Sequence, residues 1–370
     1  MDATTRQDGK RLVSLDVMRG LTVAMMIMVN NGYGESFSQL QHSKWNGMTL
    51  CDLVFPFFLF MMGISTYLSL KKTQFRATPV VLRKILKRAA LLFLIGLGIN
   101  WFDHAITGDV LCFGHLRLWA VMQRIALCYL AVSLFAITTR HVYAIPTIVA
   151  LLIVYALIII FGNGYAYDSA TNILAQVDLR LFGYDHLYHK SPVDPEGLVS
   201  TLPAIAHTMI GFLCGQIICE GHDANLKSRA LLTHGVRLAI AGFALAIWLP
   251  LNKRIWSPTY VLATCGLAII LLVIIIQLEQ STTLLQKDGE KSGLATFFLV
   301  FGMNPLFLYV LSELMAIVFG HFGINDLIFN AIHAVVAAPK WASLAYALTF
   351  VMLNWLVGYA LYRRKIFIKL

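Results

Sequence analysis

A single histidine lies in a short polar loop between two strongly apolar segments, and its position suits proton or acyl transfer. The loop spans residues 42–47 and reads HSKWNG. A histidine side chain titrates near neutral pH, which makes it the usual general base or acyl carrier. Because the flanking segments tether a loop this short, we expect it to fold inward and to hold His42, Trp45 and Asn46 over the helices.

Two amides and a carboxylate flank this loop. Asn30 and Asn31 come near the end of the first apolar segment, and Asp52 begins the second. An amide can donate a hydrogen bond to the oxyanion that develops during acyl transfer, and a carboxylate can orient its neighbours. We expect Asn30 to support His42 and Asp52 to orient it, while the residues alone leave Asn31 open as the supporting amide.

The opposite end of the first apolar segment carries an acid and a base one helical turn apart. Asp16 and Arg19 form an i, i+3 pair, and Ser14 before them suits a helix cap. One interpretation is structural, namely a cap and an ion pair at the membrane surface. The other is a phosphate-binding site formed by Arg11 and Arg19, since the guanidinium fork matches phosphoryl oxygens.

Two further polar side chains lie within apolar segments. Because placing a polar side chain inside a membrane costs free energy, we regard both as candidate functional residues. Arg124 lies within segment 118–138, and we expect it to line the site or to support it. Asn304 belongs to a GMNP sequence, residues 302–305, that interrupts segment 295–317. With Asp16, both are candidates for lining the site.

The composition determines what kind of molecule positions these residues. Of the 370 residues, 58% are hydrophobic and 13% are charged, whereas soluble domains carry about 25% charged residues. This excludes an ordinary water-soluble domain and predicts one all-α transmembrane bundle over 1–370. About ten spans of roughly 20 residues fit the chain, and we place them at 17–33, 52–70, 88–102, 118–138, 142–162, 201–219, 235–250, 258–278, 295–317 and 342–362.

The distribution of charge predicts the orientation of these spans. Most of the 29 Lys and Arg residues fall on one side of them, and basic loops stay on the cytoplasmic face. We therefore expect a cytoplasmic N-terminus (1–16), a cytoplasmic tail (363–370) and a long outer loop (163–200) that forms an ordered cap. The net charge of +10 then reflects topology, and no basic stripe indicates a nucleic-acid partner.

The cysteines and the N-terminus predict neither a metal site nor a cleaved leader. Six cysteines lie in or beside apolar segments, with no CxxC pair and no Cys/His metal spacing, so we expect small buried side chains and no metal. The N-terminus is polar and carries no cleavage-site pattern before the first apolar segment. We therefore expect the first helix to be retained.

Taken together, these motifs closely resemble the heparan-alpha-glucosaminide N-acetyltransferase family, in a bacterial-type form without the large luminal N-terminal domain. Their order and number make the match specific over nearly the whole transmembrane part. The residues that carry it are Arg11-Leu12, Ser14, Asp16, Arg19-Gly20, Asn30, His42, Trp45-Asn46-Gly47, Asp52 to Pro56, Met62-Gly63, Gln123-Arg124, Asp194 to Gly197, Thr201, Asn252-Lys253, Trp256-Ser257, Tyr260 and Gly302-Met303-Asn304.

The resemblance implies a transmembrane acyltransferase that takes acetyl-CoA from the cytosol. The acetyl group would pass to the amine of a glucosamine-type sugar on the far side of the membrane. His42 matches the family's active-site histidine, Asn30 its supporting asparagine, and Arg11 and Arg19 its phosphate-side arginines. The resemblance also implies a homodimer in the lipid bilayer, here of a bacterial inner membrane.

Two other functions use the same polar groups. An amino-sugar transporter would bind its substrate in the same cavity without an acyl donor, although no internal repeat is evident in the sequence. An O-acetyltransferase of an envelope polysaccharide would act on a hydroxyl group instead of an amine. Whether His42 acts as a general base or forms an acetyl-imidazole also stays open.

Overall fold

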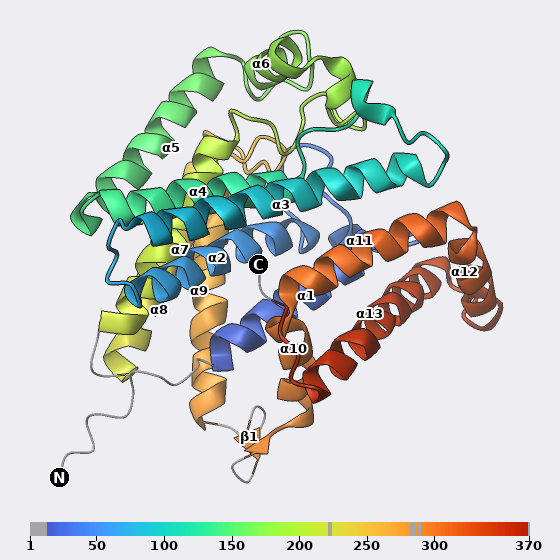
Figure 1. Cartoon of the computed structure of the whole chain (residues 1–370). Helices are drawn as coiled ribbons and strands as arrows, with labels where there is room; N and C mark the ends of the chain where they lie inside the picture. The colour runs from blue at the N-terminus through green and yellow to red at the C-terminus, as the bar shows by residue number, and fades with distance from the viewer. Residues whose placement is uncertain (1–12, 221–223, 282–285, 288–289, 369–370) are drawn as a thin grey trace.

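The computed structural model describes residues 13–220, 224–281, 286–287 and 290–368, and these form a helical bundle (Figure 1). Two antiparallel two-residue strands, β1 (Gln286–Lys287) and β2 (Glu290–Lys291), are the exception. The helices are α1 (Val13–Asn30), α2 (Val54–Lys71), α3 (Pro79–Ala105), α4 (Val121–Thr138), α5 (Ala144–Phe161), α6 (Ile173–Phe182), α7 (Thr201–Glu220), α8 (Ala224–Leu245), α9 (Pro258–Ser281), α10 (Gly293–Met303), α11 (Pro305–His321), α12 (Ile324–Val335) and α13 (Pro339–Arg363).

The helical class predicted from composition is confirmed, but fewer than ten helices of the described chain have the length and hydropathy of a membrane span. Seven helices of the described chain are long and apolar enough to cross a membrane, or eight if α10 and α11 together form one span. The predicted spans 88–102 and 235–250 do form helices, α3 and α8. Neither helix contains an uninterrupted apolar stretch long enough to cross a membrane. Basic and other polar residues, such as Arg88 and Arg237, interrupt or flank their apolar stretches.

The predicted interruption of segment 295–317 is confirmed. Helices α10 and α11 meet at an angle of 79°, and Asn304 is the residue between them. Pro305 occupies the first turn of α11. Backbone N–H groups in a first turn have no acceptor within the helix, so proline, which lacks this group, is tolerated there. The chain therefore breaks here and restarts in a new direction.

Helix α1 is at the centre of the bundle and packs against α2, α9, α10, α11 and α13. Its contact with α10 is unusually close, because glycines face backbone on both sides. A Cβ atom on Gly20 would lie 1.8 Å from the carbonyl oxygen of Phe298, and one on Gly302 would lie 1.9 Å from that of Asp16. Only a residue without a side chain fits these two positions.

A methyl group at this contact is expected to destabilise the bundle. Gly302→Ala should lower the free energy of unfolding by about 1–3 kcal/mol, the usual cost of overpacking, because backbone atoms cannot move aside. Gly98→Ala is the matched control, since Gly98 lies within α3 with no atom near its missing Cβ. Thermal unfolding in detergent checks this, and equal melting temperatures for the two variants would contradict it.

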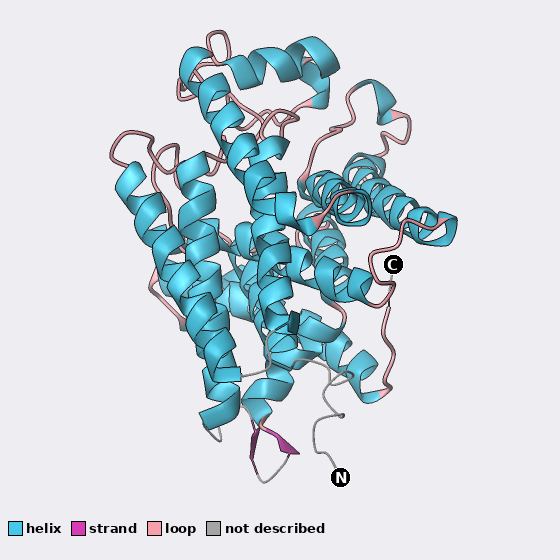
Figure 2. Ribbon diagram, turned by 90° about the vertical axis from the view of Figure 1, so that its left-hand side faces the viewer, coloured by secondary structure: helices cyan, strands magenta, loops and turns pink. Residues whose placement is uncertain are grey.

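Loops gather at the end of the bundle where α6 lies, and the β1–β2 hairpin lies at the opposite end (Figures 1 and 2). The stretch 163–200, which we expect to be an outer loop, contains α6. Asp178 on α6 is buried, and its Oδ1 accepts a hydrogen bond from the Leu198 N–H group at 3.0 Å. This contact joins the two halves of the loop. Burial raises the pKa of the Asp178 carboxyl group to about 7, although the Leu198 bond opposes the shift.

Asp178 makes the stability of the cap depend on pH. A carboxyl pKa above its unfolded value means that the folded state holds the proton between about pH 4 and 7, so stability is lost as pH rises through that window. We expect the melting temperature to fall from pH 5 to pH 8, and to fall less in Asp178→Asn. Asp185→Asn, an exposed acid in the same loop, is the control and should keep the wild-type dependence.

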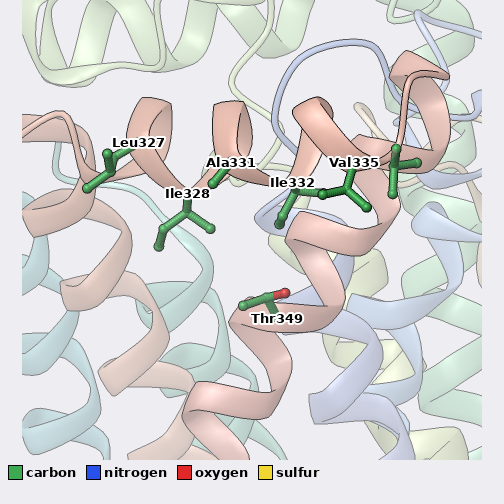
Figure 3. A pocket seen from close by; sticks show the side chains of 7 residues that line it. Leu327, Ile328, Ala331, Ile332, Val335 and Thr349 are labelled. Carbon is green, nitrogen blue, oxygen red and sulfur yellow. The ribbon is translucent and has the colours of Figure 1, made fainter.

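An apolar groove lies between α12 and α13 (Figure 3). Its walls include Leu327, Ile328, Ile332 and Val335, with Thr349 on α13. Leu327 and Val335 are 72% and 86% exposed, which suits a surface that faces lipid. Helix α12 is therefore amphipathic, with its apolar side chains on the groove.

Candidate active site

His42 and Asp52 form a hydrogen-bonded pair at the end of the bundle where the loops gather. The Nδ1 atom of His42 lies 2.8 Å from Oδ1 of Asp52. The Asp52 side chain is fully buried, whereas 40% of the His42 side chain is exposed. A carboxylate at Nδ1 fixes the imidazole tautomer that keeps the proton there, so Nε2 carries the free lone pair.

The local fold fixes Asp52 in place through its second oxygen. Oδ2 accepts hydrogen bonds from the backbone N–H groups of Ser43 and Thr49 and from the Thr49 hydroxyl, each at 3.1 Å. The hydroxyl of Tyr260 on α9 donates to the backbone carbonyl of Asp52. Loop 42–49 therefore wraps around the carboxylate at the start of α2.

Lys253 and Cys51 complete the surroundings of the imidazole. The Lys253 Nζ atom lies 3.1 Å from Nε2 and 3.0 Å from Nδ1 of His42, and 3.8 Å from Oδ1 of Asp52. The Cys51 Sγ atom lies 3.1 Å from Nδ1. Burial lowers the pKa of the Lys253 amine, and the Asp52 carboxylate opposes that shift.

His42 and Lys253 open into a cavity of about 310 Å³. Asn30, the last residue of α1, lines this cavity and donates a hydrogen bond from Nδ2 to Oε1 of Glu313 at 3.3 Å. Asn31 instead donates to the carbonyl of Ile27 and is not among the lining residues. The other polar lining residues are Asn100, Arg117, Tyr188, Glu196, Arg254 and Tyr309.

An ion-pair cluster fixes one wall of this cavity. The Arg117 guanidinium binds Oδ1 of Asp194 at 3.0 Å and Oε2 of Glu196 at 2.9 Å, and lies 4.5 Å from the centre of the Tyr188 ring. The Asn100 side chain of α3 donates to the Arg117 carbonyl at 2.8 Å. The loops before α4 and before α7 are therefore tied together around the cavity.

Trp45 and Asn46 brace the histidine loop and do not line the cavity. The Trp45 indole donates to the carbonyl of Tyr165 at 2.9 Å, and the Asn252 amide donates to Asn46 Oδ1 at 3.1 Å. These contacts tie loop 42–47 to the outer loop and to the segment before α9. We expected both residues as site-lining candidates, and in the structure their side chains make loop-to-loop contacts instead of lining the cavity.

Arg124 and Asn304, also expected to line the site, lie away from the cavity. Arg124 is fully buried and donates to the Gly197 carbonyl at 3.0 Å and to the Ser200 hydroxyl. These contacts stabilise the turn into α7. The Asn304 amide binds the segment after α13: its Nδ2 group donates to the Ile366 carbonyl at 3.0 Å, and its Oδ1 atom accepts from the Ile368 N–H group at 2.8 Å. Asn304 can reach this segment because it lies at the break between α10 and α11.

Asp16 and Arg19 lie near the other end of α1. They form an ion pair at 3.0 Å, and Arg19 also donates to the Ser65 hydroxyl at 2.8 Å. The Arg19 side chain is 22% exposed. Asp16 therefore does not line the cavity, because its position in the first turns of α1 is remote from the His42 end. Arg11 lies outside the described residues.

Three functional candidates escaped the sequence analysis. In the sequence, Lys253 and Glu196 are distinguished only as members of polar motifs. Glu313 is a carboxylate within segment 295–317, and the rule that intramembrane acids are costly would have singled it out. For Lys253 no sequence signal predicts contact with His42, since 211 residues separate them.

The fold and this site define a polytopic helical membrane protein with a histidine–aspartate pair at a polar cavity. The family model described as "Heparan-alpha-glucosaminide N-acetyltransferase, catalytic" matches residues 11–253. The chain belongs to this family.

Two curated relatives extend the match over almost the whole chain. Heparan-alpha-glucosaminide N-acetyltransferase of Mus musculus is 26% identical over 99% of the chain, and that of Homo sapiens is 26% identical over 97%. The chain spans 62% and 60% of the lengths of these two proteins.

Proposed function

We propose that this protein transfers an acetyl group from acetyl-CoA to the amine of a glucosamine-type sugar across a membrane. The observation that carries the proposal is the His42–Asp52 pair, 2.8 Å apart, with His42 and Lys253 together at a polar cavity. Family membership supports acyl transfer, because the names of both relatives contain that activity.

The step at Nε2 is an attack of the acceptor amine on the thioester. His42 takes a proton from the amine nitrogen as that nitrogen bonds to the acetyl carbon, and the C–S bond then breaks. The sulfur leaves with the proton, which gives an amide and free coenzyme A. The amide of Asn30 and the ammonium group of Lys253 donate to the oxyanion of the intermediate, since both lie at the cavity with His42.

The same atom also serves a two-step route, in which Nε2 attacks the thioester and an acetyl-imidazole forms first. Incubation with labelled acetyl-CoA and no acceptor separates the two routes. Label that stays with wild type after rapid gel filtration at pH 7 and is absent from His42→Ala supports the two-step route. Its absence from both supports direct transfer.

The carboxylates of the cavity suit an amino sugar. Glu196 and Glu313 accept hydrogen bonds from hydroxyl or ammonium groups, and Asn100 and Tyr188 add further polar contacts. Small-molecule sites of this kind combine a few placed polar groups with an apolar surround. We assign this side of the cavity to the acceptor.

The donor enters from the opposite end of α1. Arg19 and Asn30 are eleven residues apart, which corresponds to roughly 16 Å along a helix. The arm of acetyl-CoA is long enough to cross this distance while its phosphates stay near Arg19 and Arg11. We retain three predictions from the sequence: both termini are cytoplasmic, the protein lies in a bacterial inner membrane, and it forms a homodimer.

Arg19→Lys is expected to raise KM for acetyl-CoA about tenfold with a smaller change in kcat, because lysine keeps the charge but loses the two-pronged fork. Steady-state kinetics with varied acetyl-CoA measures this. Arg363→Lys, an exposed arginine at the end of α13, is the control. An unchanged KM together with a lower melting temperature would assign Arg19 to the ion pair with Asp16 alone.

Purified protein in proteoliposomes tests the proposal directly. Labelled acetyl-CoA and glucosamine should give N-acetylglucosamine, identified by mass spectrometry, while glucose should give no product. Acetylation of glucose would favour the O-acetyltransferase. Movement of glucosamine without acetyl-CoA, and no acetylated product, would favour the transporter and overturn the proposal.

A further inference from the structure

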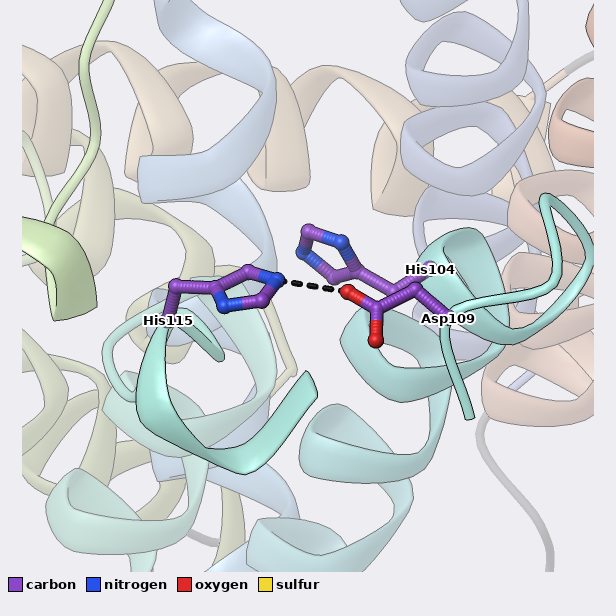
Figure 4. A group of neighbouring side chains, drawn as sticks. All are labelled: His104, Asp109 and His115. Carbon is purple, nitrogen blue, oxygen red and sulfur yellow. Dashed lines mark hydrogen bonds and ion pairs between the residues drawn. The ribbon is translucent and has the colours of Figure 1, made fainter. Parts of the chain in front are cut away.

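A second cluster of chemically capable side chains lies outside the cavity, where α3 ends and the loop to α4 begins (Figure 4). Within the described part of the chain, His104, Asp109 and His115 form a group whose ligand atoms all lie within 4.8 Å of one another. None of the three lines the cavity.

We propose that His104, Asp109 and His115 bind a divalent transition-metal ion, with Zn²⁺ as the ion that fits best. Two imidazoles and one carboxylate are a common zinc ligand set, with a remaining position for water. Ca²⁺ and Mg²⁺ prefer oxygen ligands. The proposal does not rest on the proposed function.

The distances suit a site that closes around an ion. The His115 Nε2 atom lies 2.7 Å from Asp109 Oδ2, and the His104 and His115 ring centres are 5.1 Å apart. Ligands at the usual zinc bond lengths of about 2.0–2.2 Å lie roughly 3.3 Å from each other. Small side-chain rotations bridge that difference, because His115 and Asp109 are 50% and 45% exposed.

The backbone already brings the three ligands together. The carbonyl of His104 accepts the N–H group of Asp109 at 3.2 Å, and the Trp101 indole donates to the Val110 carbonyl at 3.0 Å. Gly108 has a φ of +96°, a conformation that glycine adopts without strain. The chain therefore turns back on α3 before any ion binds, which lowers the ordering cost of binding.

The ion-free contacts do not by themselves explain this arrangement. An exposed histidine–carboxylate pair contributes little to stability. Among the three side chains drawn in Figure 4, the marked contact joins His115 to Asp109, and the His104 ring lies beside this pair. A metal ion would use all three side chains. It would also fix the loop that carries Arg117, two residues beyond His115 and on the cavity wall.

Metal titration of the full-length protein tests the site. The protein is purified in detergent with its affinity tag removed, treated with EDTA, and titrated with Zn²⁺ by calorimetry and with Co²⁺ by visible absorption. We expect one equivalent of tightly bound metal, a Co²⁺ spectrum of low coordination number, a higher melting temperature, and slower amide hydrogen exchange in residues 104–116.

Single substitutions assign the ligands. His104→Ala, Asp109→Asn and His115→Ala should each weaken Zn²⁺ binding by at least about tenfold, on the scale of losing one metal contact. Two controls should bind as wild type does: His234→Ala, an exposed histidine of α8, and His42→Ala, which removes the cavity imidazole. Since the three ligands are on the surface, melting temperatures in EDTA will show that the variants fold.

Two results would overturn the proposal. One is the absence of saturable Zn²⁺ binding to wild type up to millimolar concentration. The other is binding that persists unchanged in His104→Ala and His115→Ala, or that disappears in His42→Ala, because the ion would then be held elsewhere.

Discussion

Replacement of His42 by alanine is expected to lower kcat for acetyl transfer about a thousandfold, within the range measured for loss of a general acid–base group. The expectation follows from the position of His42, which lines the cavity while Asp52 holds its Nδ1 atom. No other described histidine lines this cavity. Binding of acetyl-CoA should change little, so KM for the donor should stay within a few-fold of wild type.

The control for this prediction is Lys44→Ala in the same loop. Lys44 is exposed and does not line the cavity, so its activity should be that of wild type. Product formation from labelled acetyl-CoA and glucosamine measures both variants. Full activity of His42→Ala would remove His42 from the chemistry and with it the mechanism proposed above.

Asp52→Asn should lower kcat nearly as much, by about a hundredfold to ten-thousandfold, although the two side chains have the same shape. The introduced amide would present either its NH₂ group or a neutral oxygen to Nδ1. In both cases the imidazole loses the carboxylate that holds the proton on Nδ1 and the lone pair on Nε2. The serine-protease triad gives the precedent for such a tautomer effect. The pH profile of kcat should change as well, because the imidazolium loses its partner charge.

Asp52→Asn should also destabilise the loop. Oδ2 accepts two backbone N–H groups and the Thr49 hydroxyl, and an amide NH₂ group cannot accept them. One buried unsatisfied donor costs about 1–3 kcal/mol. Asp168→Asn, an exposed acid of the outer loop, is the control for both readouts. A stable Asp52→Asn with wild-type kcat would show that the pair has no catalytic use.

Local patterns in the sequence predicted much of the secondary structure. Apolar runs of about 20 residues predict helices because a membrane leaves no other partner for backbone groups, and nearly every predicted run became one. The GMNP break was predictable for the same local reason, since Pro305 starts a helix and cannot continue one. The number of membrane spans was predicted less well, because α3 and α8 combine apolar stretches with basic residues.

The candidate site residues also differ in how far local sequence predicts their position. His42, Asn30 and Asp52 were predictable because they lie within 22 positions of one another, at the facing ends of α1 and α2. Trp45, Asn46, Arg124, Asn304 and Asp16 are all used in structural contacts. Residue type and depth in the membrane do not distinguish a side chain that lines a cavity from one that braces its wall.

The sequence by itself determined the helical class, the break before Pro305 and the position of the His42 loop, because each depends on contacts within one or two neighbouring segments. Only the tertiary structure decided that Lys253 and Glu313 join that loop, that Asn30 and not Asn31 faces the cavity, and that His104, Asp109 and His115 converge. These outcomes depend on how helices rotate and pack against one another, and distant parts of the chain set that rotation together.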